Sequence, residues 1–172
     1  LLPLLYSEGK YRPVRVLSHD KVHNQITFES RVASYFVLAE STSSIPISHD
    51  VGFMPSLDSW NTENFGGYYA PGGHSYGMAG YAAWYQQNVP GALISAFGDD
   101  TSKNVASRVQ IAQQQSWGTD AWRKSQSLSE ERLGALIKAY LYYTDEPLML
   151  LMGTGGTANS AGVAYSYNPN SI

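Results

Sequence analysis

Hydrophobic and polar positions in the first part of the chain predict short strands followed by a long loop. Residues 14–17 and 26–28 have strand-like patterns, and the apolar run 32–39 fits either a strand or a helix. Residues 41–44 are a polar loop in this interpretation. From 50 to 73, glycine, proline, asparagine and aromatic residues follow one another without a period, which predicts a long ordered loop.

Three helices are predicted in the middle of the chain. Residues 75–88 contain helix-forming alanines and stop before a Pro-Gly pair. Residues 101–116 carry apolar side chains at roughly helical spacing. Ser127 and Glu130 have the spacing of a capping box and predict a third helix over 133–140.

The last part of the chain predicts two strands joined by a tight turn. Pro147 introduces the short apolar run 148–152, the Gly-rich turn 153–156 follows, and 163–167 form the next strand. Because these strands come after the helices, the pattern predicts one α+β domain covering residues 1–172.

Composition narrows the classes of partner. A hydrophobic content of 43% indicates a folded chain, whereas the charged fraction of 15% lies well below the roughly 25% of an average domain. Polarity comes instead from uncharged side chains and 13 tyrosines, which favours an extracellular or cell-surface protein. A net charge of −3 without a basic cluster argues against a nucleic-acid partner.

The absence of cysteine has direct chemical consequences. It excludes disulfides, thiolate catalysis and cysteine metal sites. No apolar run approaches the ~20 residues needed to span a bilayer, and residues 1–5 lack the basic flank of a signal peptide. The chain also lacks an initiator methionine, so we expect a processed or excised segment, which leaves a larger parent chain open.

Chemistry is concentrated in residues 72–78, Gly-Gly-His-Ser-Tyr-Gly-Met, at the start of the predicted central helix. A nucleophile at a helix N-terminus gains from the positive end of the helix dipole and from free N–H groups that bind an oxyanion. A serine hydroxyl still needs a base to take its proton. The alternative interpretation is that Ser75 is simply the N-cap of the helix, a role that serine favours.

This segment resembles the Gly-Gly-x-Cys-Tyr/Phe-Gly-Met segment of bacterial papain-like cysteine peptidases, with Ser75 at the cysteine position. In that family a strand, a Gly-rich turn and a strand beginning His-Ala-Val-Val-Ala-Tyr come later in the chain. Residues 148–167 keep this order, with Ser160 at the histidine position. The resemblance covers roughly residues 52–167. It implies a papain-like α+β fold, in which the central helix packs against a small antiparallel sheet or partial barrel.

The departures from the family pattern affect the expected chemistry. The oxyanion glutamine implied shortly before the nucleophile is missing, since Tyr69 and Ala70 stand there, and Asn64 is the candidate substitute. His74 is adjacent to Ser75, so we expect its side chain to point away from the serine. Ser75 therefore has no evident general base, and losing a triad member costs several orders of magnitude in rate.

Other sites are interpreted as structural. The His-Asp pairs at 19–20 and 49–50 are typical of surface turns rather than of metal sites. Residues 153–157 lack the Lys-Ser/Thr end of a phosphate loop and precede a strand rather than a helix. No cofactor and no metal are indicated. Aromatic residues between 53 and 69 either line a groove for a peptide or glycan or pack onto their own core.

Three functions stay open at this point. The first is a catalytically silent papain-like domain that binds a peptide or protein partner through the former active-site cleft. The second is an active cysteine peptidase or acyl transferase whose nucleophile and base have been replaced by serine. The third is a structural surface or assembly subunit that contacts other subunits.

Overall fold

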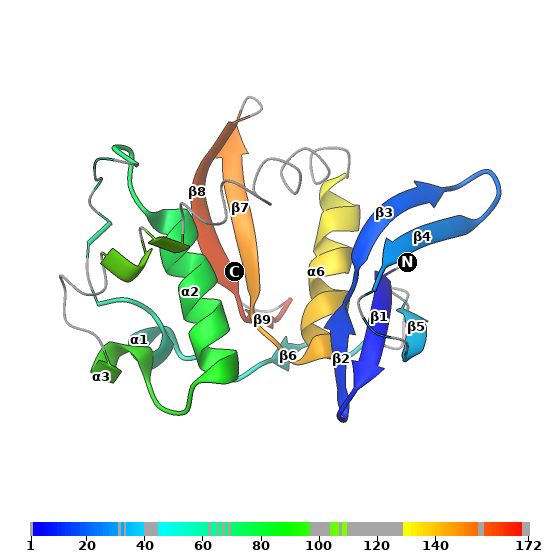
Figure 1. The fold of residues 1–172 in the computed structure, drawn as a ribbon, viewed down its shortest axis with the longest axis horizontal. Helices are drawn as coiled ribbons and strands as arrows, with labels where there is room; N and C mark the ends of the chain where they lie inside the picture. Colours follow the sequence, from blue (N-terminus) through cyan, green and yellow to red (C-terminus); the bar gives the residue numbers. More distant parts are fainter. Residues whose placement is uncertain are drawn as a thin grey trace.

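The computed structural model describes most of the chain. The described residues are 2–30, 32, 34–39, 45–61, 63–64, 66, 68, 70–96, 104–106, 108–109, 129–154 and 157–169. They form a mixed α/β structure of helices and small antiparallel sheets, which confirms the α+β class (Figure 1).

The N-terminal part of the chain forms two antiparallel sheets. β1 (Leu2–Ser7) lies between β2 (Lys10–Pro13) and β5 (Tyr35–Ala39), while β3 (Arg15–Asp20) pairs with β4 (Gln25–Glu29). The β1–β2 hairpin turns through Glu8 and Gly9, which have φ angles of 55° and 80°. Positive φ at both central residues is typical of the type I′ turn, whose twist matches the flanking strands.

The central helix α2 (Ser75–Asn88) has the bounds predicted from the sequence. Ala79, Ala82 and Ala83 are buried, and their small side chains allow α2 to pack closely against a hairpin. That hairpin consists of β7 (Leu148–Thr154) and β8 (Thr157–Ala164), paired from Leu148 opposite Ala164 to Thr154 opposite Thr157.

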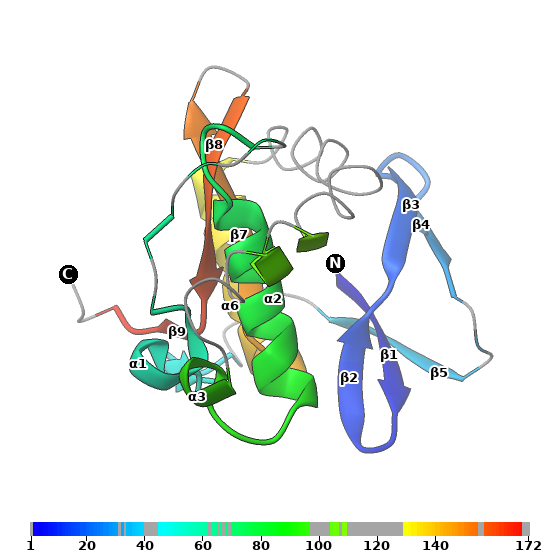
Figure 2. The same ribbon diagram turned by 60° about the vertical axis from the view of Figure 1, so that its left-hand side comes forward.

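The second long helix, α6 (Glu130–Thr144), lies between the β7–β8 hairpin and the N-terminal sheet (Figures 1 and 2). Its N-cap is Ser129, whose hydroxyl accepts a hydrogen bond from the Arg132 N–H. The helix ends at Asp145, which has the left-handed φ of 54°. Within the described residues, no helix is both long and apolar enough to span a membrane.

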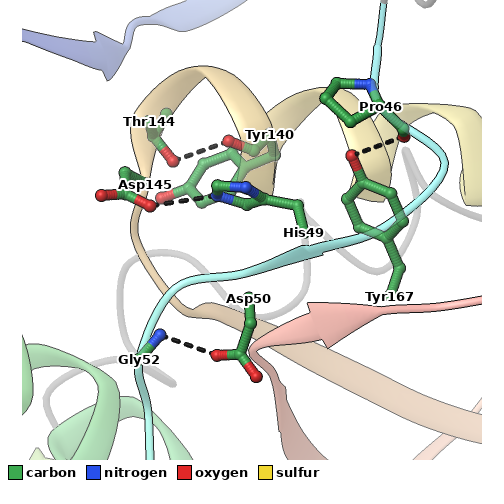
Figure 3. Close-up of polar contacts among 8 residues, drawn as sticks. All are labelled: Pro46, His49, Asp50, Gly52, Tyr140, Thr144, Asp145 and Tyr167. Atoms are coloured by element: carbon green, nitrogen blue, oxygen red, sulfur yellow. Dashed lines mark hydrogen bonds and ion pairs between the residues drawn. The ribbon is translucent and has the colours of Figure 1, made fainter.

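Short elements complete the fold. They are β6 (His49–Asp50), α1 (Pro55–Asp58), α3 (Leu93–Ala96) and β9 (Ser166–Tyr167). β6 pairs with β9, and His49 Nε2 lies 3.0 Å from Asp145 Oδ1 at the end of α6 (Figure 3). Tyr167 Oη donates to the Pro46 carbonyl at 3.2 Å, so side chains hold residues 46–50 against both β9 and α6.

The hydrophobic core lies between α2, α6 and the C-terminal strands. Its buried members are Val51, Phe53, Ala82, Tyr85, Leu93 and Leu141. Val51 and Phe53 come from the segment predicted as a loop, and Val51 N–H donates to the Tyr165 carbonyl at 3.0 Å. This segment therefore contributes to the core and connects the N-terminal part of the chain to the C-terminal strands.

Several predicted elements differ from those observed. The run 32–39 is a strand from residue 35 onward, and the loop 50–73 contains the short helix α1. The capping box from Ser127 is wrong, because Ser129 caps α6 and the helix is longer than predicted at both ends. The last predicted strand is interrupted at Tyr165, between β8 and β9. Most of the helix predicted over 101–116 lies outside the described residues; 104–106 and 108–109 are helical.

Candidate functional site

Ser75 is the first residue of α2, at the end of the helix where N–H groups have no intrahelical partners. The N-cap is His74, so the interpretation of Ser75 as the N-cap is wrong. The Ser75 hydroxyl oxygen accepts a hydrogen bond from the Ala161 N–H of β8 at 3.2 Å. This bond joins two segments 86 residues apart in the chain. Ser160 is the residue directly before Ala161 on β8.

Asn64 lies across the entrance to α2. Its side-chain oxygen accepts a short hydrogen bond from the His74 N–H. Gly73, with a φ of 119°, makes room for this side chain, since a Cβ on Gly73 would lie 2.7 Å from the Asn64 amide nitrogen. The oxygen of Asn64 thus satisfies an N–H at the helix terminus, which leaves its amide nitrogen as the group able to donate to an anion.

Ser75, Ser160 and Asn64 line one cavity of about 500 Å³. The size falls within the range of ordinary ligand-binding pockets. Most of the wall is apolar and comes from α2, β8 and the segment before α2. The apolar residues are Phe53, Pro55, Trp60, Met78, Ala79, Ala82, Ala161, Val163 and Tyr165, and Gly162 of β8 also lines the wall.

Trp60 fixes one wall of this cavity. Its indole N–H donates to the Met78 carbonyl at 2.8 Å, and its ring stacks on Tyr81 at a centroid distance of 5.4 Å. A hydrogen bond at one edge and a stacked ring on one face hold the indole in a defined position.

Of the aromatic residues predicted to line a groove, Phe53 and Trp60 do so, whereas Tyr68 is 93% exposed. Phe65 and Tyr69 lie outside the described residues.

The cavity wall offers Ser75 no base. Among the described lining residues there is no histidine, aspartate, glutamate, lysine or arginine. His74 is buried and does not line the cavity, as expected from its position next to Ser75. Burial raises the pKa of the neighbouring Tyr76, so its phenol stays protonated at neutral pH. The described polar groups of the site are hydroxyl, amide and backbone N–H groups.

No family model, curated protein or solved structure matches this chain.

The remaining sequence candidates fall outside this cavity. Asp20 binds the backbone of the β3–β4 turn, and its carboxylate lies 2.7 Å from His23 Nδ1, an interaction that lowers the Asp20 pKa. His49 contacts Asp145 rather than its neighbour Asp50. Among the described residues, no group of three histidine, aspartate or glutamate side chains is arranged to hold a metal ion.

One functional group was not predicted from the sequence. The Ala161 N–H contacts the Ser75 hydroxyl, yet the side chain of alanine carries no chemical signal. The group belongs to the backbone of β8, and it faces α2 because the other side of β8 pairs with β7. A strand edge next to a helix N-terminus places several N–H donors in one region.

Proposed function

We propose that this protein is a papain-like domain without catalytic activity that binds a peptide or protein partner through the cavity beside Ser75. The observation that carries the proposal is the 3.2 Å hydrogen bond between Ser75 and Ala161. The resemblance puts a nucleophile at Ser75 and a base at Ser160, and the bond joins Ser75 to Ala161, the residue after Ser160. Ser75 and Ser160 line the same cavity although they are far apart in the sequence, as a nucleophile and its base would have to be close in space.

The character of the cavity supports binding rather than hydrolysis. Its mostly apolar wall, with aromatic side chains at Phe53, Trp60 and Tyr165, suits apolar peptide side chains. The edge of β8 that faces away from β7 suits the backbone of an extended peptide. The absence of a base among the described lining residues leaves Ser75 as a weak nucleophile. The low charge and many tyrosines favour a location outside the cell for this interaction.

Restoring the two family residues tests the proposed ancestry of the site. We expect Ser75→Cys with Ser160→His to react with iodoacetamide about tenfold faster at mildly acidic pH than Ser75→Cys alone, because a neighbouring imidazolium and the helix N-terminus both lower a thiol pKa. The matched control combines Ser75→Cys with Ser166→His, which places the histidine at an exposed position on β9. Equal rates for the two histidine variants, both folded, would contradict the papain-like interpretation.

Peptide binding is tested separately. A displayed library of random peptides is selected against the protein, and enriched peptides are measured by fluorescence polarisation. Ala79→Leu places extra volume in the cavity and is expected to weaken binding at least tenfold, whereas Ser56→Leu, on the exposed side of α1, leaves it unchanged. Failure to enrich any peptide on the folded protein, or equal binding by the Ala79→Leu variant, would count against a peptide-binding cavity.

A second candidate function, that of an assembly subunit, is favoured by the exposed strand β5. Tyr35 is 81% exposed and Leu38 is 50% exposed, and among the described residues β5 pairs only with β1. Exposed apolar edge strands are sites of pairing with other chains. If this function holds, the protein forms concentration-dependent oligomers in light scattering and Leu38→Lys abolishes them, while a monomer at high concentration argues against it.

A further inference from the structure

A second, polar cavity of about 190 Å³ shares no residue with the cavity beside Ser75. It forms where β2 meets the C-terminal ends of α2 and α6. Its polar side chains come from these elements and from the turn before β7: Lys10, Arg12, Gln87, Asn88, Tyr140 and Glu146. Three of them are charged, whereas the described wall of the first cavity contains no charged side chain.

Two cations line one side of this polar cavity. Lys10 and Arg12 occupy alternate positions of β2, so their side chains leave the same face of the strand. Within the described residues, neither side chain takes part in an ion pair or a hydrogen bond. An arginine at a cavity wall binds carboxylate groups through two parallel N–H donors.

One carboxylate, that of Glu146, also lines the cavity. Burial raises the pKa of Glu146, even though the charges of Lys10 and Arg12 act in the opposite direction. The cations are therefore near enough to influence Glu146 electrostatically, but no ion pair joins them within the described residues. The wall therefore carries two basic side chains and one acidic side chain.

The neutral groups of the wall are fixed in place. Gln87 donates through its side-chain nitrogen to the Pro147 carbonyl at 3.4 Å, and Asn88 donates to the Trp84 carbonyl at 2.8 Å. Their side-chain oxygens remain as acceptors. Burial raises the pKa of Tyr140 to about 12, so its phenol remains a donor at neutral pH. The wall thus combines strong donors for an anion with acceptors for a nearby N–H or O–H group.

We propose that this cavity binds a small 2-amino or 2-hydroxy carboxylic acid, with the carboxylate on Lys10 and Arg12 and the neighbouring donor on Glu146. The cavity volume of about 190 Å³ is smaller than the roughly 300–1,000 Å³ of pockets for drug-sized ligands, which suits a small acid with a short side chain. The carboxylate of the ligand matches the two cationic side chains of the wall, and its ammonium or hydroxyl group matches the carboxylate of Glu146. This binding is independent of the cavity beside Ser75.

Four small molecules test the proposal by NMR titration of the isotope-labelled protein. L-serine and L-lactate carry both groups, propionate lacks the donor, and ethanolamine lacks the carboxylate. We expect saturable shifts at β2 and around Glu146 with L-serine or L-lactate at millimolar concentrations, binding about tenfold weaker with propionate, and none with ethanolamine. Because L-serine carries an ammonium group that L-lactate lacks, saturable shifts with L-serine but not with L-lactate would show that the ammonium is the required donor.

Variants locate the binding. Arg12→Gln is expected to weaken every carboxylate at least tenfold. Glu146→Gln should remove the preference for L-serine or L-lactate over propionate. The matched control is Arg15→Gln on β3, because Arg15 lies outside the cavity and 3.4 Å from Glu29. The proposal is overturned if neither two-group ligand gives saturable shifts, or if Arg15→Gln weakens binding as much as Arg12→Gln does.

Discussion

Gly73 shows how a single backbone conformation supports the cavity beside Ser75. With a φ of 119°, it occupies a region that side-chain-bearing residues rarely adopt, and it leaves space for the Asn64 amide. Asn64 can then accept from the His74 N–H and hold the loop against the start of α2. The two glycines before His74 therefore have different roles, since only Gly73 has both a positive φ and a close neighbour.

Replacing Gly73 by alanine tests this role. We expect Gly73→Ala to lower the free energy of unfolding by about 1–3 kcal/mol, because it combines a strained φ with a Cβ 2.7 Å from Asn64. Gly72→Ala is the control: its Cβ meets nothing within 4 Å and its φ is not in the strained region. Urea denaturation measures both, and a loss for Gly73→Ala no larger than for Gly72→Ala would contradict the proposed packing of Asn64.

At the residue scale, some of the site residues could be predicted from the sequence, whereas their backbone contacts could not. Ser75, Ser160 and Asn64 were selected because of a family motif, and the structure places all three on one cavity. The contact of Ser75 with the Ala161 backbone could not be predicted, since any residue supplies an N–H. Lys10 and Arg12 of the polar cavity were also missed, because two basic residues on a short strand have no distinctive pattern.

At the scale of elements, the sequence predicted secondary structure accurately for segments whose structure depends mainly on their own residues. α2 was predicted with its observed bounds because alanines favour the helix and a Pro-Gly pair follows its end. β1 was missed, since residues 2–7 become a strand through pairing with β2 in a hairpin and with β5 about thirty positions later. The capping serine of α6 was misassigned because Ser127 and Ser129 both stand shortly before the same acidic residues, and only the geometry distinguishes them.

The contact between β6 and α6 makes a prediction at this scale. His49 Nε2 lies 3.0 Å from Asp145 Oδ1, and the Tyr142 ring packs edge-on against the imidazole at 5.7 Å (Figure 3 shows the His49–Asp145 contact). Asp145 is largely exposed, so the pair is expected to contribute only about 0.5–1 kcal/mol. A double-mutant cycle with His49→Gln and Asp145→Asn measures this coupling.

The design of this cycle keeps the backbone constant. Asn tolerates the left-handed conformation of Asp145, so Asp145→Asn removes the charge without adding backbone strain. If the losses in stability from the two single variants simply add, there is no coupling between His49 and Asp145, and β6 is held against α6 by other contacts.

The stability of the whole molecule should depend on alkaline pH through Tyr140. Burial and then the charge of Glu146 raise the Tyr140 pKa to about 12, against about 10 in an unfolded chain. Stabilisation from the protonated phenol is therefore complete below about pH 10 and is lost between about pH 10 and 12, amounting to on the order of 2 kcal/mol. Urea denaturation across this interval should show a steeper decline for the native protein than for Tyr140→Phe.

Tyr68→Phe is the matched control for this effect, because Tyr68 is 93% exposed. We expect its alkaline decline to equal that of the native protein. A decline for Tyr140→Phe as steep as that of the native protein would show that other groups cause the alkaline loss of stability.

The 86-residue separation between Ser75 and Ala161 has a consequence for the order of folding. Helix α2 has its own local signals and can form early, but the cavity needs β8, which follows α2 later in the chain. Closing a loop of this length costs about 4 kcal/mol of chain entropy before the contact is made. The cavity beside Ser75 is thus a late product of folding, and a growing chain carries α2 without this cavity until β8 has been made and has joined it.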